Sequence, residues 1–241
     1  MMEVFMFAIY RREVQSYFYT SAAYVFLGVF LTLGSIFFGV TNLASRSGNL
    51  LALFAELSYL WMLLSPILTM RLIAGERQRN TDQMLLTSPC SLTGIVMGKY
   101  LAACTVLLLA VVSSMMYACV VAVYGKLYLA ETAVGYLGLV LHGCAFIALD
   151  LFVSCFAKSQ MTAVVMGFGV DLLVWMADVL ASAVTIETIS KALDFISLYR
   201  RFSPFVRGQL SLSSVMFYLL FIAVMIFLSV RALDARRWSE A

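Results

Sequence analysis

The chain has 241 residues, of which 63% are hydrophobic and only 12% are charged, and its formal net charge is +3. Soluble domains are about 45–50% apolar and about 25% charged, so this composition argues against an ordinary water-soluble fold. The small net charge is spread along the chain, and we therefore expect no nucleic-acid-binding surface.

The chain opens with a predicted amphipathic helix at residues 3–18. Phe7, Tyr10 and Val14 recur at helical spacing, whereas Arg12 lies elsewhere on the helix. We expect this helix to lie along the inner membrane interface, with its aromatic side chains in the lipid and its arginine head groups in water. A simple extension of the first span is the alternative.

Long apolar segments dominate the rest of the chain. Crossing a hydrocarbon core of ~30 Å takes roughly 20 helical residues. The apolar residues run continuously instead of alternating, which favours helices over a β-barrel. The expected fold is therefore an all-α integral membrane protein with six transmembrane helices. The predicted spans are residues 21–41, 54–74, 100–124, 132–156, 160–183 and 211–231.

The positions of Lys and Arg orient these spans, because cytoplasmic loops are enriched in both residues. With both termini inside, ten Lys and Arg residues lie on the inner side and six on the outer side, of the 16 in the chain. We therefore expect both termini in the cytoplasm and a multi-pass protein of the inner (plasma) membrane.

The loop between the second and third spans contains both charges and apolar side chains. Asn80 or Thr81 can cap a short helix, Asp82 would lie in its first turn, and Pro89 follows its end. Residues 84–86 (Met-Leu-Leu) form an apolar patch among these charges. The loop is suited to docking a soluble partner, and a plain positively charged loop is the alternative.

No complete catalytic or nucleotide-binding motif occurs in the sequence. The segment from Gly94 to Gly98, Lys99 and Tyr100 has one residue too few for a P-loop and lacks the Ser or Thr that would reach Mg²⁺. We expect close helix packing at the two glycines, with Lys99 anchored at the membrane interface. The five cysteines include no C-x-x-C pair, so we expect no metal site and no cofactor.

Two acidic residues, Asp171 and Asp178, lie within the fifth predicted span. A charge at the bilayer centre costs about 2.5–3.5 kcal/mol on insertion scales, so the helix face that they share should point to a water-filled path or a helix interface. A hydrogen-bonded structural role is the alternative. The pattern Gly167-Phe-Gly-Val-Asp171 has one residue too many for an intramembrane aspartyl protease, and neither Asp150 nor Asp178 follows the Tyr expected of a second catalytic Asp.

The outer connection, residues 184–210, has its own apolar pattern. Ile189, Leu193 and Ile196 recur at helical spacing, and Pro204 marks a break. We expect a helix that lies on the outer leaflet or dips into it, and a solvated loop is the alternative.

Residues 71–101 resemble the cytoplasmic loop of ABC-2 type transporter permeases. The likeness rests on Glu76-Arg77, on Thr81-Asp82-Gln-Met-Leu-Leu, on Pro89 and on Gly98-Lys99. Asn80 and Asp82 stand where the family usually has Gly and Glu. The end of the chain, from Phe202 to Trp238, is similar to permeases of the gliding-motility transporter group.

This resemblance implies a single ABC-2 type transmembrane domain over residues 1–241, acting as the permease subunit of an ATP-binding cassette transporter, usually an exporter. Two copies of a separate ATPase subunit would hydrolyse ATP, so the chain itself would not be an enzyme. A second permease chain, identical or related, would complete the path through the lipid bilayer. The loop helix at 77–88 would be the coupling helix, and the outer segment would be re-entrant.

The resemblance also implies roles for individual residues. The expected ATPase-coupling residues are Glu76, Arg77, Asn80, Thr81, Asp82, Leu85, Leu86 and Pro89. Asp171 and Asp178 are the candidates for the translocation path. The competing interpretation is an ion-coupled secondary carrier, which would use acidic residues near the midplane, or a structural membrane subunit without transport.

Overall fold

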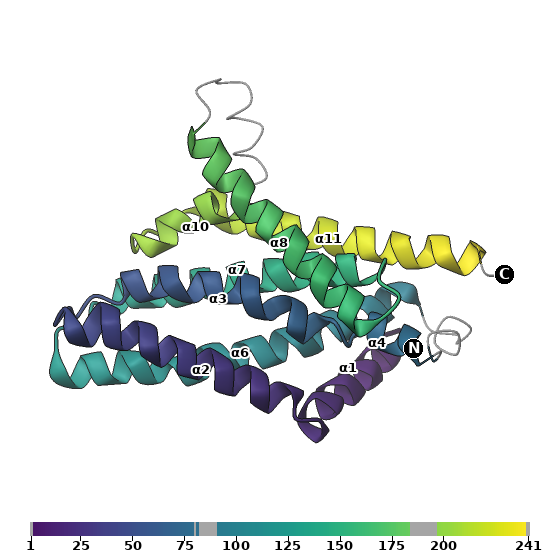
Figure 1. The fold of residues 1–241 in the computed structure, drawn as a ribbon, viewed down its shortest axis with the longest axis horizontal. Coiled ribbons are helices and arrows are strands. Elements are labelled where there is room, and N and C mark those ends of the chain that lie inside the picture. Colours follow the sequence, from purple (N-terminus) through teal and green to yellow (C-terminus); the bar gives the residue numbers. More distant parts are fainter. Residues whose placement is uncertain (1, 80, 82–90, 184–196, 240–241) are drawn as a thin grey trace.

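The computed structural model describes residues 2–79, 81, 91–183 and 197–239 (Figure 1). Within these residues, six helices are long and apolar enough to cross a membrane, which confirms the predicted all-α integral membrane fold. The elements are α1 (Met2–Tyr19), α2 (Ala22–Phe38), η1 (Gly39–Ala44, a π-helical turn), α3 (Leu51–Thr69), α4 (Ala74–Gln78), α6 (Leu92–Tyr124), α7 (Leu129–Ser154), α8 (Gln160–Ala183), α10 (Leu198–Val206) and α11 (Leu212–Ser239).

The helices extend beyond some of the predicted spans. α6 begins at Leu92, well before residue 100, because the Ser91 side chain caps it by accepting a hydrogen bond from the Gly94 backbone N–H. α11 likewise continues past residue 231 to Ser239. Sequence patterns locate the apolar part of a helix, whereas backbone hydrogen bonding continues past the charged residues at its ends.

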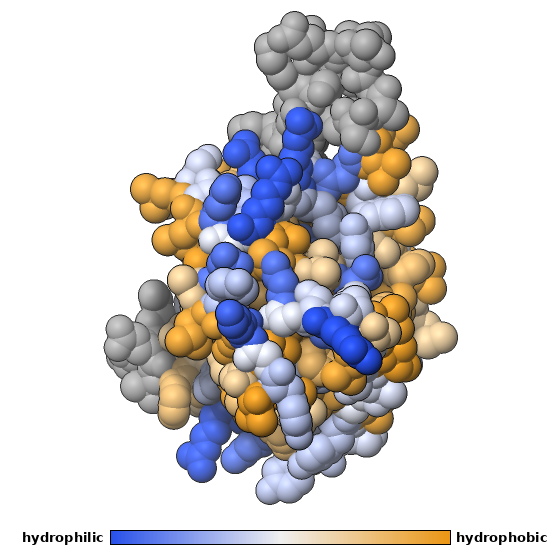
Figure 2. Space-filling view, turned by 90° about the vertical axis from the view of Figure 1, so that its left-hand side faces the viewer, coloured by the Kyte–Doolittle hydropathy of each residue, from blue (hydrophilic) through white to orange (hydrophobic). Residues whose placement is uncertain are grey.

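The spans run between two ends of an elongated bundle (Figure 1). α1, α4, the turn between α7 and α8, and the C-terminal part of α11 gather at one end, which we call the α1 end. η1, the start of α3, the α6–α7 connection and α10 gather at the opposite α10 end. Polar side chains spread across the middle of the α10 end, and apolar ones lie along its margins, as expected for a bundle whose sides face lipid (Figure 2).

α7 is the central helix of the bundle. Its span is 72% buried, whereas those of α8 and α11 are each 17% buried. Glycines let neighbouring helices approach α7 closely: Gly135 faces Phe54 of α3, and Gly143 faces Leu107 of α6. Lipid is as apolar as the helix surfaces, so the hydrophobic effect does not hold membrane helices together. Close packing is then the main attraction between helices, and small residues make it possible.

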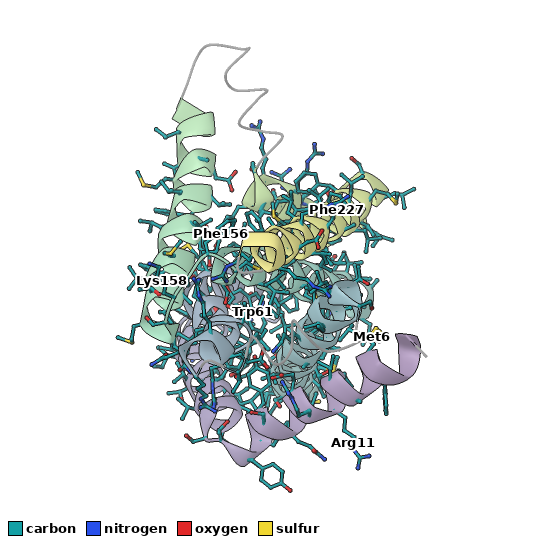
Figure 3. All side chains as sticks on the ribbon, turned by 90° about the vertical axis from the view of Figure 1, so that its right-hand side faces the viewer. Met6, Arg11, Trp61, Phe156, Lys158 and Phe227 are labelled. Atoms are coloured by element: carbon teal, nitrogen blue, oxygen red, sulfur yellow. The ribbon has the colours of Figure 1, made fainter. Side chains whose placement is uncertain are left out.

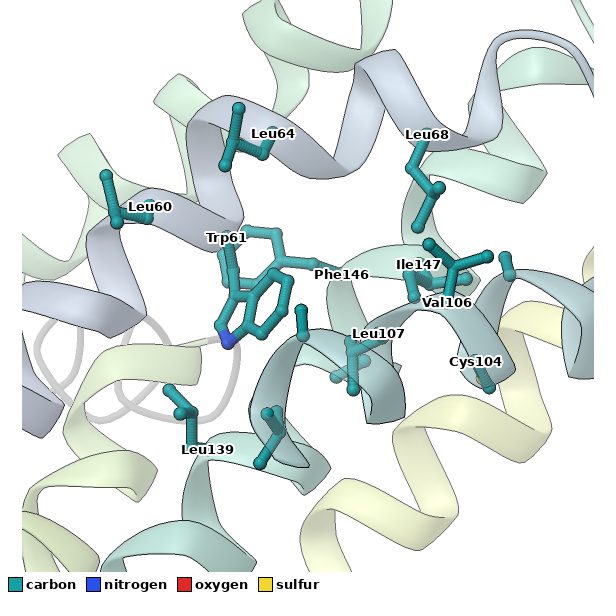
Figure 4. Packing of buried hydrophobic residues seen from close by; sticks show 14 of the residues in the cluster. Leu60, Trp61, Leu64, Leu68, Cys104, Val106, Leu107, Leu139, Phe146 and Ile147 are labelled. Carbon is teal, nitrogen blue, oxygen red and sulfur yellow. The ribbon is translucent and has the colours of Figure 1, made fainter. Parts of the chain in front are cut away.

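Trp61 of α3 is at the centre of the core. Its side chain is 1% exposed and stacks on Phe30 of α2, with ring centroids 4.7 Å apart. Leu107 of α6 and Phe146 of α7 belong to the same cluster (Figure 4). Four spans therefore meet around one aromatic ring.

α1 lies across the α1 end, and Arg11 points away from the bundle (Figure 3). The expectation that its aromatic side chains face lipid is wrong for two tyrosines. Tyr17 is buried and donates a hydrogen bond to the Leu68 carbonyl at 2.6 Å, and the Tyr10 hydroxyl lies 3.0 Å from Thr105 Oγ1. Phe7 alone of these three is largely exposed, at 62%. Most of this face therefore packs on protein, because the tyrosine hydroxyls find partners there.

We expect Gly138→Ala to destabilise the protein. A methyl group on Gly138 of α7 would lie 2.5 Å from Phe205 Cβ, an atom that cannot rotate away, so α10 would have to shift. Overpacking of this kind costs about 1–3 kcal/mol. Thermal unfolding in detergent measures the loss. Gly169→Ala in α8 is the matched control, because nothing lies within 4 Å of its added methyl group. Equal stability of the two variants would contradict this packing.

Candidate functional site

The residues predicted for partner coupling fall at the α1 end. Glu76 and Arg77 lie on α4, directly before the predicted docking loop. Thr81 donates its backbone N–H and its hydroxyl to the Glu76 carbonyl, at 3.0 and 3.1 Å. The remaining predicted residues, Asn80, Asp82, Leu85, Leu86 and Pro89, lie outside the described residues, as does most of the predicted coupling helix.

A buried ammonium group organises this end of the bundle. Lys99 of α6 is 1% exposed, and its Nζ lies 3.0 Å from Glu13 of α1 and 2.9 Å from Glu76 of α4. It also donates to the Leu72 carbonyl at 2.5 Å, so all three of its N–H donors have a partner. Arg12 of α1 completes the ionic network at 2.5 Å from Glu76 and 2.8 Å from Glu13.

The Lys99 head group is therefore paired inside the protein and does not reach water, and its position at the level of the membrane interface stays a prediction. Gly98 helps to explain its position: a Cβ on Gly98 would lie 3.0 Å from the Met6 carbonyl oxygen of α1, so an added methyl group would press α1 away from α6 by a few tenths of an ångström. Close packing at Gly98 agrees with the expectation from sequence. With α1 covering it, the Lys99 ammonium has acidic residues as neighbours in place of water.

The electrostatics of the network favour its ionised form. Burial by itself disfavours the Glu13 carboxylate, but the charges and hydrogen bonds of Lys99 and Arg12 outweigh this and lower the pKa of Glu13 below its usual value of 4.5. The side chains of Glu13 and Glu76 are 12% and 18% exposed, whereas that of Arg12 is 58% exposed. Lys99 is thus the inner member of the network and Arg12 the outer one.

The turn between α7 and α8 is held from two sides. Arg77 of α4 donates to the Ala157 carbonyl at 2.9 Å, and Arg236 of α11 donates to the Cys155 carbonyl at 3.2 Å. The Ala74 N–H also donates to the Ser154 hydroxyl at 3.2 Å. α4 is therefore bound to α1 and α6 through Glu76 and to the α7–α8 turn through Arg77.

A cavity of about 310 Å³ opens beside the network. Its wall includes Arg12, Arg71, Arg79 and Glu76, and Gln160 at the start of α8. The cavity therefore lies between α1, α4 and α8. Within the described part of the chain, no three His, Cys, Asp or Glu side chains come together as a metal site would require.

Asp171 and Asp178 share a face of α8 but contact different elements. Asp171 is 0% exposed, and its Oδ2 accepts a hydrogen bond from Ser65 of α3 at 3.4 Å. Asp178 accepts from the Tyr199 backbone N–H at 3.0 Å and from the Ser197 hydroxyl, so it holds the first turn of α10. A role for either residue on a translocation path stays a prediction.

Sequence reasoning did not select Asp150 of α7 as a site residue. It is 2% exposed and lies inside the fourth span. The one signal in the sequence was the position of Asp150 inside the fourth predicted span. An acidic residue there requires a partner or has a function. Its nearness to Asp171 depends on how α7 and α8 pack, which no sequence pattern indicates.

The described part of the outer connection is helical. α10 includes Pro204 in its last turns, so the expected break at this residue is wrong, and the helix continues to Val206. Phe202 of α10 stacks on His142 of α7, with ring centroids 4.7 Å apart, and Tyr218 of α11 donates to the Leu198 carbonyl at 2.7 Å. α10 thus packs on α7 and α11. The predicted pattern at Ile189, Leu193 and Ile196 lies outside the described residues.

We expect Glu13→Gln to lower stability at neutral pH by about 1.5–3 kcal/mol, the usual worth of a hydrogen bond to a charged group. Because the folded-state pKa of Glu13 is lowered, its stabilisation is present above pH 4.5 and is lost as the pH falls through the folded-state value. The difference from the unmodified protein should therefore shrink in acid. Thermal unfolding in detergent across this pH range checks it.

Asp234→Asn is the matched control for Glu13→Gln. Asp234 pairs with Arg231 at 3.9 Å, and their side chains are 38% and 66% exposed. Exposed pairs of this kind contribute about 0–1 kcal/mol, so this variant should change little at any pH. A Glu13→Gln difference that stayed constant into acid would show that the carboxylate charge does not stabilise the fold.

Residues 58–233, most of the chain, match the family model described as ABC-2 family transporter protein. This region contains α4, the turn held by Arg77 and Arg236, and the three buried or half-buried aspartates of the spans. Comparison with curated proteins gives no match. The chain belongs to the ABC-2 family of transporter proteins, and it is a multi-pass membrane permease subunit.

Proposed function

We propose that this permease is driven by separate ATP-binding cassette ATPase subunits that dock at the α1 end, and that it acts as an exporter. The observation that carries the proposal is the position of α4. This helix directly precedes the predicted docking loop, and its side chains bind three other parts of the bundle. A partner that moved the loop would therefore move α4 and the elements bonded to it.

The bonds of α4 supply two routes for such a movement. Glu76 is joined to α1 by its ion pair with Arg12 and to α6 by its ion pair with Lys99. Arg77 is joined to the turn between α7 and α8 by a hydrogen bond. Arg236 joins the same turn to α11 by another. Because ion pairs and hydrogen bonds resist separation, α4 would act as a rigid-body lever on the spans. We assign Glu76 and Arg77 to transmission, and Asn80, Thr81, Asp82, Leu85, Leu86 and Pro89 to docking.

The proposed assembly contains two ATPase subunits and two permease chains in the inner membrane, with both termini cytoplasmic. The exposed apolar sides of α8 and α11 support this arrangement, since such faces require lipid or a second permease chain. A second permease chain, identical or related, and membership of the gliding-motility group stay predictions from the resemblance.

One observation supports the alternative of an ion-coupled carrier. Asp150 and Asp171 are buried acids inside the spans, as a carrier driven by an ion gradient would need. The two functions differ in their energy source. An ATPase-driven exporter requires nucleotide and the partner, whereas a carrier requires only an ion gradient.

We expect substrate transport in vesicles to require a separate ATP-binding cassette ATPase. Vesicles with both proteins should transport substrate only when ATP is added, and replacing the ATPase's P-loop lysine should abolish transport while both proteins are still incorporated. A broad substrate screen with labelled lipids, peptides and drugs supplies the readout. Transport that continued without the ATPase under a proton gradient would establish the carrier function in its place.

Docking and transmission can be separated by two variants. Leu85→Arg with Leu86→Arg should reduce co-purification of the ATPase at least tenfold, because charges replace the proposed apolar contact. Arg77→Ala should leave co-purification intact but lower ATP-driven transport, because the hydrogen bond to the Ala157 carbonyl is lost. Arg79→Ala, which changes an exposed arginine two residues further along, is the control for Arg77→Ala. Normal transport by Arg77→Ala would refute the lever.

A further inference from the structure

Two acidic side chains lie inside the helix bundle without a cation. Asp150 of α7 is 2% exposed and Asp171 of α8 is 0% exposed. In the described residues, neither forms an ion pair with Lys, Arg or His. Three of their four carboxyl oxygens are buried without a hydrogen-bond partner, namely both of Asp150 and Oδ1 of Asp171. Buried polar atoms of this kind are rare and need a physical account.

The two carboxyl groups lie close together at the contact between α7 and α8, within electrostatic range of each other. A Cβ on Gly167 of α8 would lie 2.8 Å from Asp150 Oδ1, so the Asp150 carboxyl group touches α8 at Gly167. Asp171 is four residues further along α8, on the same helix face and about 5–6 Å away between Cβ positions. Glycine at position 167 thus makes room for Asp150 within one helical turn of Asp171.

α3 closes the site from a third side. Its Ser65 hydroxyl donates to Asp171 Oδ2 at 3.4 Å, and Pro66 Cβ would lie 3.0 Å from the same added Cβ on Gly167. α8 passes across α3 and α7 in this region (Figure 1). The site is therefore enclosed by three spans, with one weak donor for two acids.

The other titratable groups near the pair do not neutralise it. On α10, the Tyr199 phenol lies within electrostatic range of Asp171, and its buried hydroxyl has no hydrogen-bond partner. On α8, Asp178 is a further acid, already engaged by Ser197 and by the Tyr199 backbone N–H. α3 contributes only the uncharged Ser65 hydroxyl. No described neighbour therefore supplies a positive charge.

We propose that Asp150 and Asp171 form a proton-binding site within the membrane-spanning bundle and hold at least one proton between them at neutral pH. Two adjacent carboxylates in an apolar surrounding repel one another and lose their hydration, and a bound proton relieves both penalties. It also creates an O–H donor that can serve an oxygen now without a partner.

This site has a consequence for transport that does not rest on the proposed ATPase. The proton lies between α7 and α8, the two helices joined by the turn that Arg77 and Arg236 hold. A movement that separated these helices or admitted water would weaken proton binding. Proton occupancy and the relative position of α7 and α8 are therefore linked, and each responds to the other.

A membrane-permeant carbodiimide tests the site in the purified full-length protein, because this reagent modifies protonated carboxyl groups in apolar surroundings. Peptide mass spectrometry should find the adduct at Asp150 or Asp171 at neutral pH, and the yield should fall as the pH is raised. Asp150→Asn should move the midpoint of Asp171 labelling down by at least about one pH unit, because the neighbouring acid is gone. A merely structural role would not shift this midpoint.

Asp178→Asn is the matched control, since it removes an acid from the same helix face and should leave the Asp150 and Asp171 labelling unchanged. If Asp150→Asn does not fold, infrared difference spectra of the unmodified protein between neutral and alkaline pH replace it and should show the carbonyl stretch of a protonated carboxyl group being lost. Absence of both the adduct and this band in folded protein overturns the proposal. Labelling that Na⁺, K⁺ or Ca²⁺ blocks at fixed pH also overturns it, in favour of a metal cation site.

Discussion

The arrangement of the α1 end follows from the need to neutralise one buried ammonium group. Lys99 lies inside the protein, where an unpaired charge would be very costly. Glu13 and Glu76 neutralise it from two different elements, and Arg12 balances the second carboxylate, so the four side chains carry no net charge. Because removal of one partner would leave a buried charge without full compensation, the positions of α1, α4 and α6 are interdependent.

This interdependence is the basis for the mechanical role that we propose for a five-residue helix, α4. α4 could not stay folded in isolation, because short helices are marginal without tertiary contacts. Glu76 and Arg77 provide those contacts, one toward α1 and α6 and the other toward the α7–α8 turn. α7, the most buried span, continues from that turn to the opposite end, where its Gly138 contacts α10. One helix thus connects the two ends of the bundle.

Buried charged groups have three different surroundings along the bundle. At the α1 end, acids and bases pair directly around Lys99. Toward the α10 end, Asp178 accepts hydrogen bonds from the first turn of a helix, where backbone N–H groups stabilise negative charge. In the middle of the bundle, Asp150 and Asp171 have no basic side chain and no helix N-terminus as a partner among the described residues. Of the three places considered, this middle pair is the one without a partner among the described residues, which is why we assign a proton to it and not to the others.

The sequence by itself determined the six spans and the helical class of the fold. It could do so because a segment in lipid must satisfy its own backbone hydrogen bonds, which makes membrane spans a local property of composition and length. The glycine contact at residue 98 also followed from local pattern. Tertiary structure alone decided that Lys99 is buried, that Arg77 binds the α7–α8 turn and that Asp150 lies beside Asp171. Each depends on how helices distant in sequence rotate and pack against one another, and continuous apolar segments contain little information about that rotation.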